Sequence, residues 1–254
     1  MLLPTFLLLL LLTASTTAKK KKKDLSLQWA ICDSSPTDVL RKLSYPPDLP
    51  IHKLQNITYY DLFPPEYTAH GLAFRTKLHK SVPISMVKVR FPNDKIEKPD
   101  GTECKWDRYG NGTWFTCRVA NTLEEGKPLW SAEQIAFAER YFEVQWDQLI
   151  PYGPLVNPKW KIRILGHKTV FDSVDAEVDG ETLHLMEVEI GVKKPKHGKK
   201  KKLYKKITKI LVDAGVRICE EPQLPKTLRL FEALERKGQG GSDGLAATEQ
   251  RPLM

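Results

Sequence analysis

The chain has 254 residues, of which 41% are hydrophobic, which suits one packed domain with appended segments. Its formal net charge of +9 is concentrated in two runs that together hold fifteen lysines. The rest of the chain has 25 Lys and Arg against 31 Asp and Glu, and is therefore mildly acidic. The composition excludes a zinc site built on C-x-x-C pairs, and no stretch after residue 18 is apolar and long enough for a transmembrane helix.

The order of apolar, charged and proline-rich stretches predicts five segments. Residues 1–18 hold a leucine run that ends in small residues, which indicates a signal peptide, although no Lys or Arg precedes it. We therefore expect a secreted, extracellular protein. The segments are the signal peptide 1–18, a basic N-terminus and Pro-rich lead-in 19–50, a β domain 51–192, a lysine-rich segment with a C-terminal helix 193–237, and a disordered Gly-rich tail 238–254.

Strand patterns fill the central segment. In GLAFRTKL, the side chains of Leu72 and Phe74 alternate with Arg75 and Lys77, and ISMVKVRF repeats this alternation, which predicts half-buried strands with one face in water. Later, SVDAEV and ETLHLMEVEI flank Asp179-Gly180, which predicts a hairpin in which Ala176 faces Leu183 and Val174 faces Leu185. The fold class is mostly β, an antiparallel barrel or sandwich with one or two short helices and disordered basic and Gly-rich tails.

Three further stretches are predicted separately. A short helix is expected near Thr37 to Leu43, and another from Lys226 to Arg236. Ser131 and Gln134 predict a helix with a capping box, followed by a strand in which Phe142, Val144 and Trp146 alternate. The prolines and glycine of residues 151–158 predict a loop.

Four cysteines in a chain bound for an oxidising compartment favour disulfides. The thirteen residues between Cys104 and Cys117 suit the closure of a hairpin, which leaves Cys32 to pair with Cys219, although three pairings are arithmetically possible. Glycosylation sequons begin at Asn56 and at Asn111, and both predict surface positions.

The lysine-rich segment is the strongest candidate for an interaction surface. Its ten lysines, with no acid among them, would attract an anionic polysaccharide, a nucleic acid or a membrane surface. Leu203, Ile207, Ile210 and Leu211 recur at helical spacing, which predicts a basic amphipathic helix. A solvated loop or a processing site remains the alternative. The candidate anion-binding residues are Lys193, Lys194, Lys196, Lys199, Lys200, Lys201, Lys202, Lys205, Lys206 and Lys209.

The strand order between Ile57 and Leu165 resembles the secreted fungal β-barrel family typified by the major allergen of Alternaria. The matching residues are Tyr59, Phe74, Val89, Cys104, Trp114, Cys117, Phe142, Trp146, Trp160 and Ile162. The resemblance implies a compact extracellular β-barrel or sandwich that binds a ligand and catalyses nothing known. The chain departs from that family in its length, its lysine-rich segment and its C-terminal third.

No motif of a hydrolase, a phosphate-binding glycine loop or a metalloprotease is present, and carboxylate pairs such as Glu187 and Glu189 suit solvated strand faces. We therefore expect a secreted, non-enzymatic binding protein, effector-like or allergen-like, with no cofactor and no metal site. The alternatives are a secreted hydrolase whose site is assembled from dispersed residues, and a purely structural or interaction protein. A deep pocket with convergent carboxylates would favour the hydrolase, whereas a filled barrel would count against it.

Overall fold

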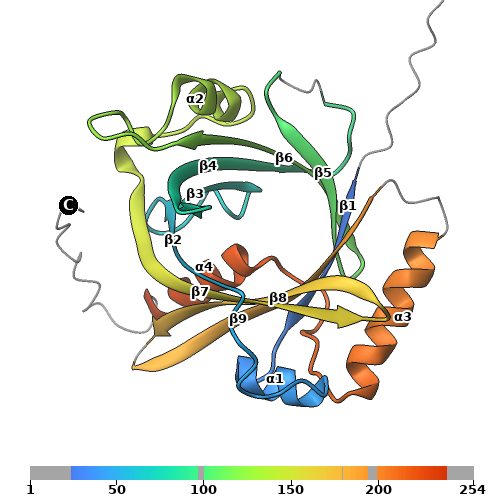
Figure 1. Ribbon diagram of the computed structural model, residues 1–254. Helices are drawn as coiled ribbons and strands as arrows, with labels where there is room; N and C mark the ends of the chain where they lie inside the picture. The colour runs from blue at the N-terminus through green and yellow to red at the C-terminus, as the bar shows by residue number, and fades with distance from the viewer. Residues whose placement is uncertain (1–23, 97–99, 179, 194–198, 239–254) are drawn as a thin grey trace, which may run out of the picture.

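The protein is described by a computed structural model that covers residues 24–96, 100–178, 180–193 and 199–238. The predicted signal peptide, the first lysine run and the Gly-rich tail after residue 238 lie outside the described residues. Nine strands form one closed barrel in the order β1-β5-β6-β4-β3-β2-β7-β8-β9, which confirms the mostly-β class (Figure 1).

The strands are β1 Leu25–Ile31, β2 Lys53–Asp61, β3 Leu72–His79, β4 Val82–Phe91, β5 Glu103–Tyr109, β6 Gly112–Thr122, β7 Ile150–Ile164, β8 His167–Val178 and β9 Glu181–Val192. The helices are α1 Pro36–Lys42, α2 Ala132–Glu139, α3 Lys199–Asp213 and α4 Lys226–Gly238, with a 3-10 turn at Trp146–Gln148.

The first strand closes the barrel. β1 pairs with β9 in the antiparallel sense and with β5 in the parallel sense, so the sheet is antiparallel except at this one junction. The sequence analysis included this stretch in a lead-in, but it is a barrel strand, and the barrel therefore begins well before residue 51. Closure leaves the sheet without a free edge.

The apolar faces of most strands point away from the barrel axis. Leu72, Phe74, Val87 and Val89 pack with α2 and the loop that follows it, outside β3 and β4. Trp160, Ile162 and Ile164 belong to a second outer cluster, which also contains apolar side chains of α1 and α3. Figure 1 shows α2 against one outer wall of the barrel and α1 and α3 against the opposite side.

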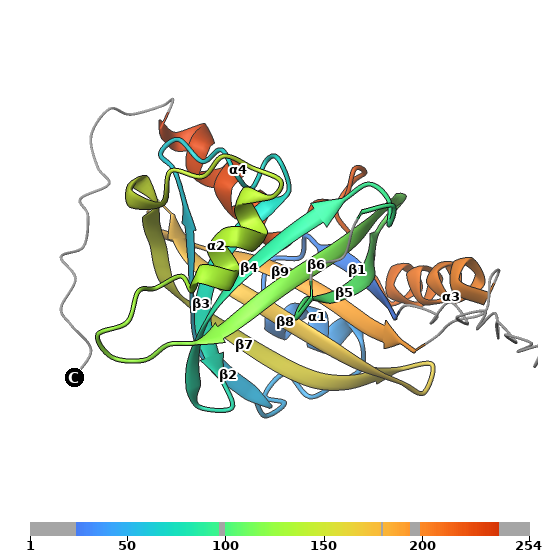
Figure 2. The ribbon, with the colours of Figure 1, turned by 90° about the horizontal axis from the view of Figure 1, so that it is seen from above.

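Turned by 90°, the barrel again has α3 outside the wall near β1 (Figure 2). Tyr204 of α3 stacks on Trp29 of β1 with ring centroids 4.7 Å apart, and the Trp29 indole N–H donates to Thr208 at 2.9 Å. α3 is the predicted amphipathic helix, since Ile207 and Leu211 are buried while five lysines face solvent. The predicted C-terminal helix is confirmed as α4.

Helix α4 differs from the others because it packs against the inside of the barrel. Leu230 and Phe231 join a third apolar cluster with Ile57, Tyr59 and Tyr152. Val174, Ala176 and Leu185 from β8 and β9 complete this cluster. In Figure 1, α4 lies within the outline of the barrel, and its apolar cluster fills one part of the interior.

Two local predictions are wrong. The stretch after α2 forms no strand: Phe142, Val144 and Trp146 pack on the outer cluster from an irregular segment, because the closed barrel offers no edge to pair with. Residues 151–158 lie inside β7 instead of a loop. Gly153, with φ of +135°, lies where the register between β2 and β7 shifts, and such a bulge accommodates the prolines around it.

Other predictions are confirmed. Ser131 and Gln134 make the predicted capping box of α2. In the β8–β9 pair, Ala176 lies opposite Leu183 and Val174 lies opposite Leu185, as Asp179-Gly180 predicts, although Asp179 itself is outside the described residues. α1 begins after the N-cap residue Ser35, close to its predicted position.

Candidate functional site

A cavity of about 710 Å³ is lined by residues from all nine strands and from the start of α4. Only the interior of the barrel touches every strand, so this cavity is the part of the interior that α4 leaves open. Its charged lining consists of Arg75, Lys77, Lys88, Arg90, Lys105, Arg118, Lys159 and Lys226, with Asp24, Glu103, Asp172, Glu187 and Glu189. Eight bases therefore face five acids.

The faces predicted to contact water on β3 and β4 are the ones that line the cavity. Arg75 and Lys77 point inward from β3, as do Lys88 and Arg90 from β4, while their apolar neighbours pack outside. Strand alternation identified the two faces correctly. The alternation suggested that the charged face meets bulk solvent. That face lines the cavity instead, because the strands close into a barrel and helices cover the outside.

One wall of the cavity has an excess of positive charge. Arg75, burial, Lys159 and Arg118 lower the pKa of Lys77 to about 6, in that order of effect. The side-chain Nε atoms of Arg75 and Arg90 are buried and, in the described part of the chain, have no hydrogen-bond partner. Half-buried cations that repel one another are costly, and an anion bound among them would relieve the repulsion and could accept hydrogen bonds from the two Nε atoms.

A first group of acids is paired with lysines at β5. Asp107 contacts the ammonium groups of Lys88 and Lys105, each at 3.2 Å, and accepts a hydrogen bond from Gln28 at 3.0 Å. Burial alone would raise the pKa of Asp107, but the two lysines outweigh it and hold the carboxyl well below its usual range. Lys105 also contacts Glu189 at 3.1 Å. These acids remain ionised and neutralise the lysines beside them.

The pKa of Lys88, which contacts Asp107, is shifted as well. Burial first, and then Arg90, lower the pKa of Lys88 to about 7, although Asp107 acts in the opposite direction. A lysine with this pKa exchanges its proton near neutral pH. Lys77 and Lys88 are thus two lysines of the cavity lining whose pKa values lie close to neutral pH.

A second group of acids surrounds the start of α4. Lys226 Nζ lies 2.5 Å from Asp172 Oδ1 and 3.1 Å from Glu187 Oε2, and Lys159 Nζ lies 2.8 Å from Asp172 Oδ2. Burial opposes the ionisation of Asp172, but Lys226 and then Lys159 lower its pKa to about 2. Asp172 is therefore ionised, and both carboxylates already contact a lysine ammonium.

The acids of the cavity do not fit a metal centre in this arrangement. Carboxylate oxygens are the ligands that Mg²⁺ and Ca²⁺ generally take in proteins. Within the described ranges, no three His, Cys, Asp or Glu side chains converge as metal ligands. Asp107, Asp172 and Glu187 each contact a lysine ammonium instead.

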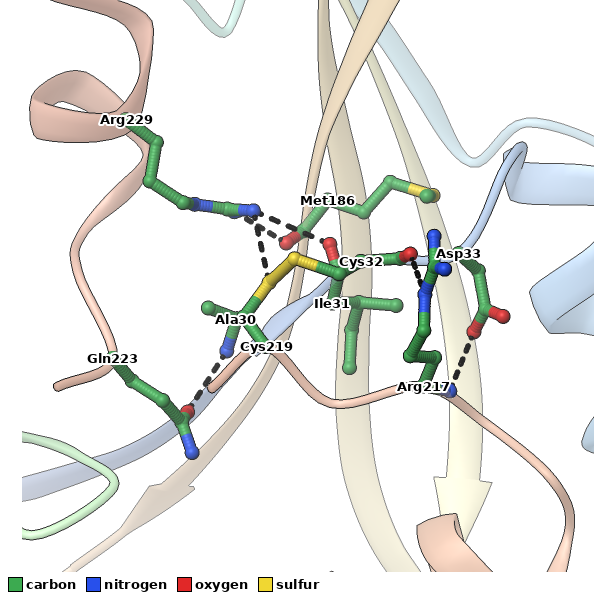
Figure 3. Close-up of a disulfide and its surroundings, with 9 residues drawn as sticks. All are labelled: Ala30, Ile31, Cys32, Asp33, Met186, Arg217, Cys219, Gln223 and Arg229. Atoms are coloured by element: carbon green, nitrogen blue, oxygen red, sulfur yellow. Dashed lines mark hydrogen bonds between the residues drawn. A yellow bond between two sulfur atoms is a disulfide. The ribbon is translucent and has the colours of Figure 1, made fainter. Parts of the chain in front are cut away.

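Both predicted disulfides form. Cys104 and Cys117 are directly opposite each other in the β5–β6 hairpin, and Cys104 reaches the cavity lining. Cys32 and Cys219 join the end of β1 to the segment before α4 (Figure 3). Both pairs match the pairing that the spacing favours.

The remaining predicted site residues are on the outside. Asn56 and Asn111 are exposed, as glycosylation requires. Lys201, Lys202, Lys205, Lys206 and Lys209 are exposed on α3, Lys200 is half-buried, and Lys193 is exposed after β9. Of Lys199 only the backbone is described, whereas Lys194 and Lys196 lie outside the described residues. Among the lysines whose side chains are described, Lys193 and the six of α3 from Lys200 to Lys209 are not part of the cavity lining.

The cavity residues were missed by the sequence analysis, which assigned Glu187 and Glu189 to a solvated strand face. Both line the cavity, and Glu187 is buried. One signal was available: bases alternate with apolar residues on β3 and again on β4, two strands that pair side by side. It did not distinguish a charged cavity from a wet outer face.

No protein-family model and no curated protein matches the chain. Among solved structures, the chain is similar to a Bacillus halodurans protein described as a candidate adenylate cyclase, with a TM-score of 0.52, 14% identity, and coverage of 83% of this chain and 99% of that one. A Hippeastrum protein described as a candidate adenylyl cyclase with a dominant triphosphatase activity has a TM-score of 0.49 and 11% identity, over 83% of this chain and 95% of that one. At these identities the likeness to the Bacillus barrel shows a shared fold and nothing further.

The expectation of a non-enzymatic binding protein, and with it the expectation of no enzyme, needs correction. The barrel shares its fold with the Bacillus halodurans structure described as a candidate adenylate cyclase, and its interior is a charged cavity in which Asp172 and Glu187 converge on Lys226, instead of a filled core. This was the feature expected of the hydrolase alternative. The resemblance to the Alternaria family stays a prediction. None of the helices in the described segments is long and apolar enough to span a membrane.

Proposed function

We propose that the protein is a hydrolase that binds a compact, phosphate-rich anion inside the barrel and cleaves a phosphoanhydride bond. The observation that carries this proposal is the row of half-buried cations on adjacent strands that line the cavity, in which Arg75 acts on Lys77 and Arg90 acts on Lys88. Arginine donates in a planar fork that matches phosphate oxygens. A small anion with several charges, such as tripolyphosphate or the triphosphate of a nucleotide, suits this wall best.

The wall can also assist the chemistry. When water attacks the terminal phosphorus, the bond to the bridging oxygen breaks, and negative charge moves onto the departing phosphate. Arginine and lysine side chains held in place before the reaction stabilise that charge. The proton of the attacking water passes to a phosphate oxygen of the products, and Lys88, paired with Asp107 at 3.2 Å, adds positive charge to the same lining.

Phosphate release from tripolyphosphate and from ATP tests this proposal, with cyclic AMP measured in the same samples. We expect the full chain to release phosphate, and Arg75→Met and Arg90→Met each to lower kcat/KM by about tenfold to a hundredfold. Lys161→Met is the matched control, because Lys161 is exposed on β7 and is not part of the cavity lining. Unchanged rates in both arginine variants, or no binding of either anion by the wild type, would contradict the proposal.

We also propose that the protein is secreted and that the lysine face of α3 contacts an anionic polysaccharide. The amphipathic helix supports this, because its buried side holds it on the barrel and leaves Lys201, Lys205 and Lys209 in solvent. Two disulfides are compatible with an oxidising compartment. Glutamine at the exposed lysines of α3 should release the protein from heparin at lower salt. Equal elution would contradict a polysaccharide contact, as would preferential binding to nucleic acid or anionic vesicles.

A further inference from the structure

Lys226 is the first residue of α4, and it extends from the plugged end of the barrel into the cavity. Its ammonium lies between Asp172 and Glu187, at 2.5 Å and 3.1 Å from one oxygen of each. Its backbone N–H donates to the other oxygen of Glu187 at 2.8 Å. Only 13% of its side chain is exposed, so the cation is built into the wall of the cavity.

The charge of Lys226 is secured by its surroundings. Burial lowers the pKa of this ammonium, but Asp172 and Glu187 outweigh burial and raise it above its ordinary value. Lys226 is therefore charged at neutral pH. A second lysine, Lys159, holds the remaining oxygen of Asp172.

The position of Lys226 is fixed by the segment around it, which Figure 3 shows in part. Arg229 donates to the carbonyl of Ile31 at 3.2 Å and to that of Met186 at 2.7 Å, which ties α4 to β1 and β9. Cys219 links the preceding segment to β1 through the disulfide with Cys32. Apolar side chains of α4 are buried in the third cluster. These contacts make α4 a fixed part of the barrel.

Two carboxylates that converge on one cation beside a phosphate-binding wall are the arrangement with which phosphoryl-transfer enzymes generally hold Mg²⁺. Here the same point is filled by an ammonium group of the chain. A lysine is a compact point charge with three donors, and it can neutralise phosphate oxygens without a metal. A metal ion could enter only by displacing both Lys226 and the contacts that hold it.

We propose that Lys226 is the resident cation of the cavity and that the barrel binds its phosphate-rich anion without a divalent metal. This inference rests on the proposed function, since it concerns the same cavity. It goes further by naming the group that balances Asp172 and Glu187, and by predicting that the anion binds as free polyphosphate instead of as a magnesium complex.

Calorimetric titration of tripolyphosphate into the full chain, with EDTA and separately with excess MgCl₂, tests the inference. We expect binding in EDTA that is at least as tight as in MgCl₂, because Mg²⁺ neutralises part of the ligand. In Lys226→Met, we expect affinity in EDTA to fall at least tenfold and to recover in MgCl₂, since the uncovered carboxylates can then take Mg²⁺ together with phosphate oxygens. Lys226→Arg should keep most of the affinity, and Lys161→Met should match the wild type.

The outcomes separate the two proposals. Wild-type binding that is at least tenfold tighter in MgCl₂ than in EDTA would overturn the metal-free inference and leave the proposed function standing. Lys226→Met binding in EDTA as tight as that of the wild type would overturn it as well. Absence of binding in both solutions would overturn the proposed function and the inference with it. Circular dichroism and urea unfolding show which variants are folded. If Lys226→Met is not folded, titration of the wild type and of Lys226→Arg in EDTA and in MgCl₂ still tests the inference.

Discussion

Replacing Lys77 with methionine tests whether the cavity holds destabilising positive charge for a ligand. Arg75, burial and neighbouring bases lower the pKa of Lys77 to about 6 in the folded state, from an ordinary value of 10.5. Between these values the unfolded chain binds more protons than the folded chain, so the penalty from Lys77 grows as the pH falls from 10.5 to 6. Methionine has a similar length and no charge, and it removes this penalty.

The magnitude follows from the pKa difference. Between pH 9 and pH 6.5, the stability advantage of Lys77→Met over the wild type should grow by at most about 3 kcal/mol, at 1.36 kcal/mol per unit. Water at the open part of the cavity screens the repulsion, so we expect about 1 to 2 kcal/mol. Urea unfolding at the two pH values without phosphate measures it, with Lys161→Met as the control.

The same substitution should weaken binding of the anion. Tripolyphosphate should raise the pKa of Lys77 by supplying an opposite charge, so binding at pH 7.5 should take up a proton that Lys77→Met does not take up. Titration calorimetry in two buffers with different ionisation enthalpies measures this uptake. A stability difference that is unchanged between pH 9 and pH 6.5, together with equal proton uptake by both proteins, would refute the cation cluster as an anion site.

Three further changes test the fold. Removing the Cys32–Cys219 disulfide with Cys32→Ala and Cys219→Ala should cost about 5 kcal/mol in urea unfolding, because it closes 187 residues of chain; a loss below 1 kcal/mol would contradict this link. Asp61→Ala should cost about 3 kcal/mol, since its buried carboxylate accepts four backbone N–H bonds at 2.9 Å; an unchanged urea midpoint would argue against that role. Tyr204→Ala should remove the stack on Trp29 and lower the free energy of unfolding by about 3 kcal/mol. It should also make α3 more accessible to trypsin, and unaltered digestion would contradict the observed docking of α3.

Local patterns predicted much of the secondary structure for direct physical reasons. Asp179-Gly180 accepts the backbone angles of a tight turn, so the β8–β9 register could be predicted from neighbouring residues alone. The Ser131 capping box satisfies backbone groups within one turn of α2, which is equally local. The stretch around Phe142 shows the limit, because its alternation suited a strand but no free sheet edge remained for it.

The site required long-range information. The bases of β3 and β4 line one cavity only because these strands pair, and Lys226 reaches Asp172 and Glu187 only because α4 packs inside the barrel. No spacing in the sequence relates residue 226 to residue 172. The cavity chemistry therefore could not be predicted from motifs, whereas the lysine-rich segment attracted notice because its charges are contiguous.

The sequence by itself determined that the strands have one apolar and one charged face, since side chains alternate across a strand whatever surrounds it. It also determined the amphipathic character of α3, which depends only on helical spacing. Tertiary structure decided which face is inside. Because β1 closes the sheet between β5 and β9 and the helices cover its outer wall, the apolar faces meet the helices and the charged faces meet one another. Because of these contacts between distant strands, the charged faces that were expected in bulk water line the cavity of the candidate site.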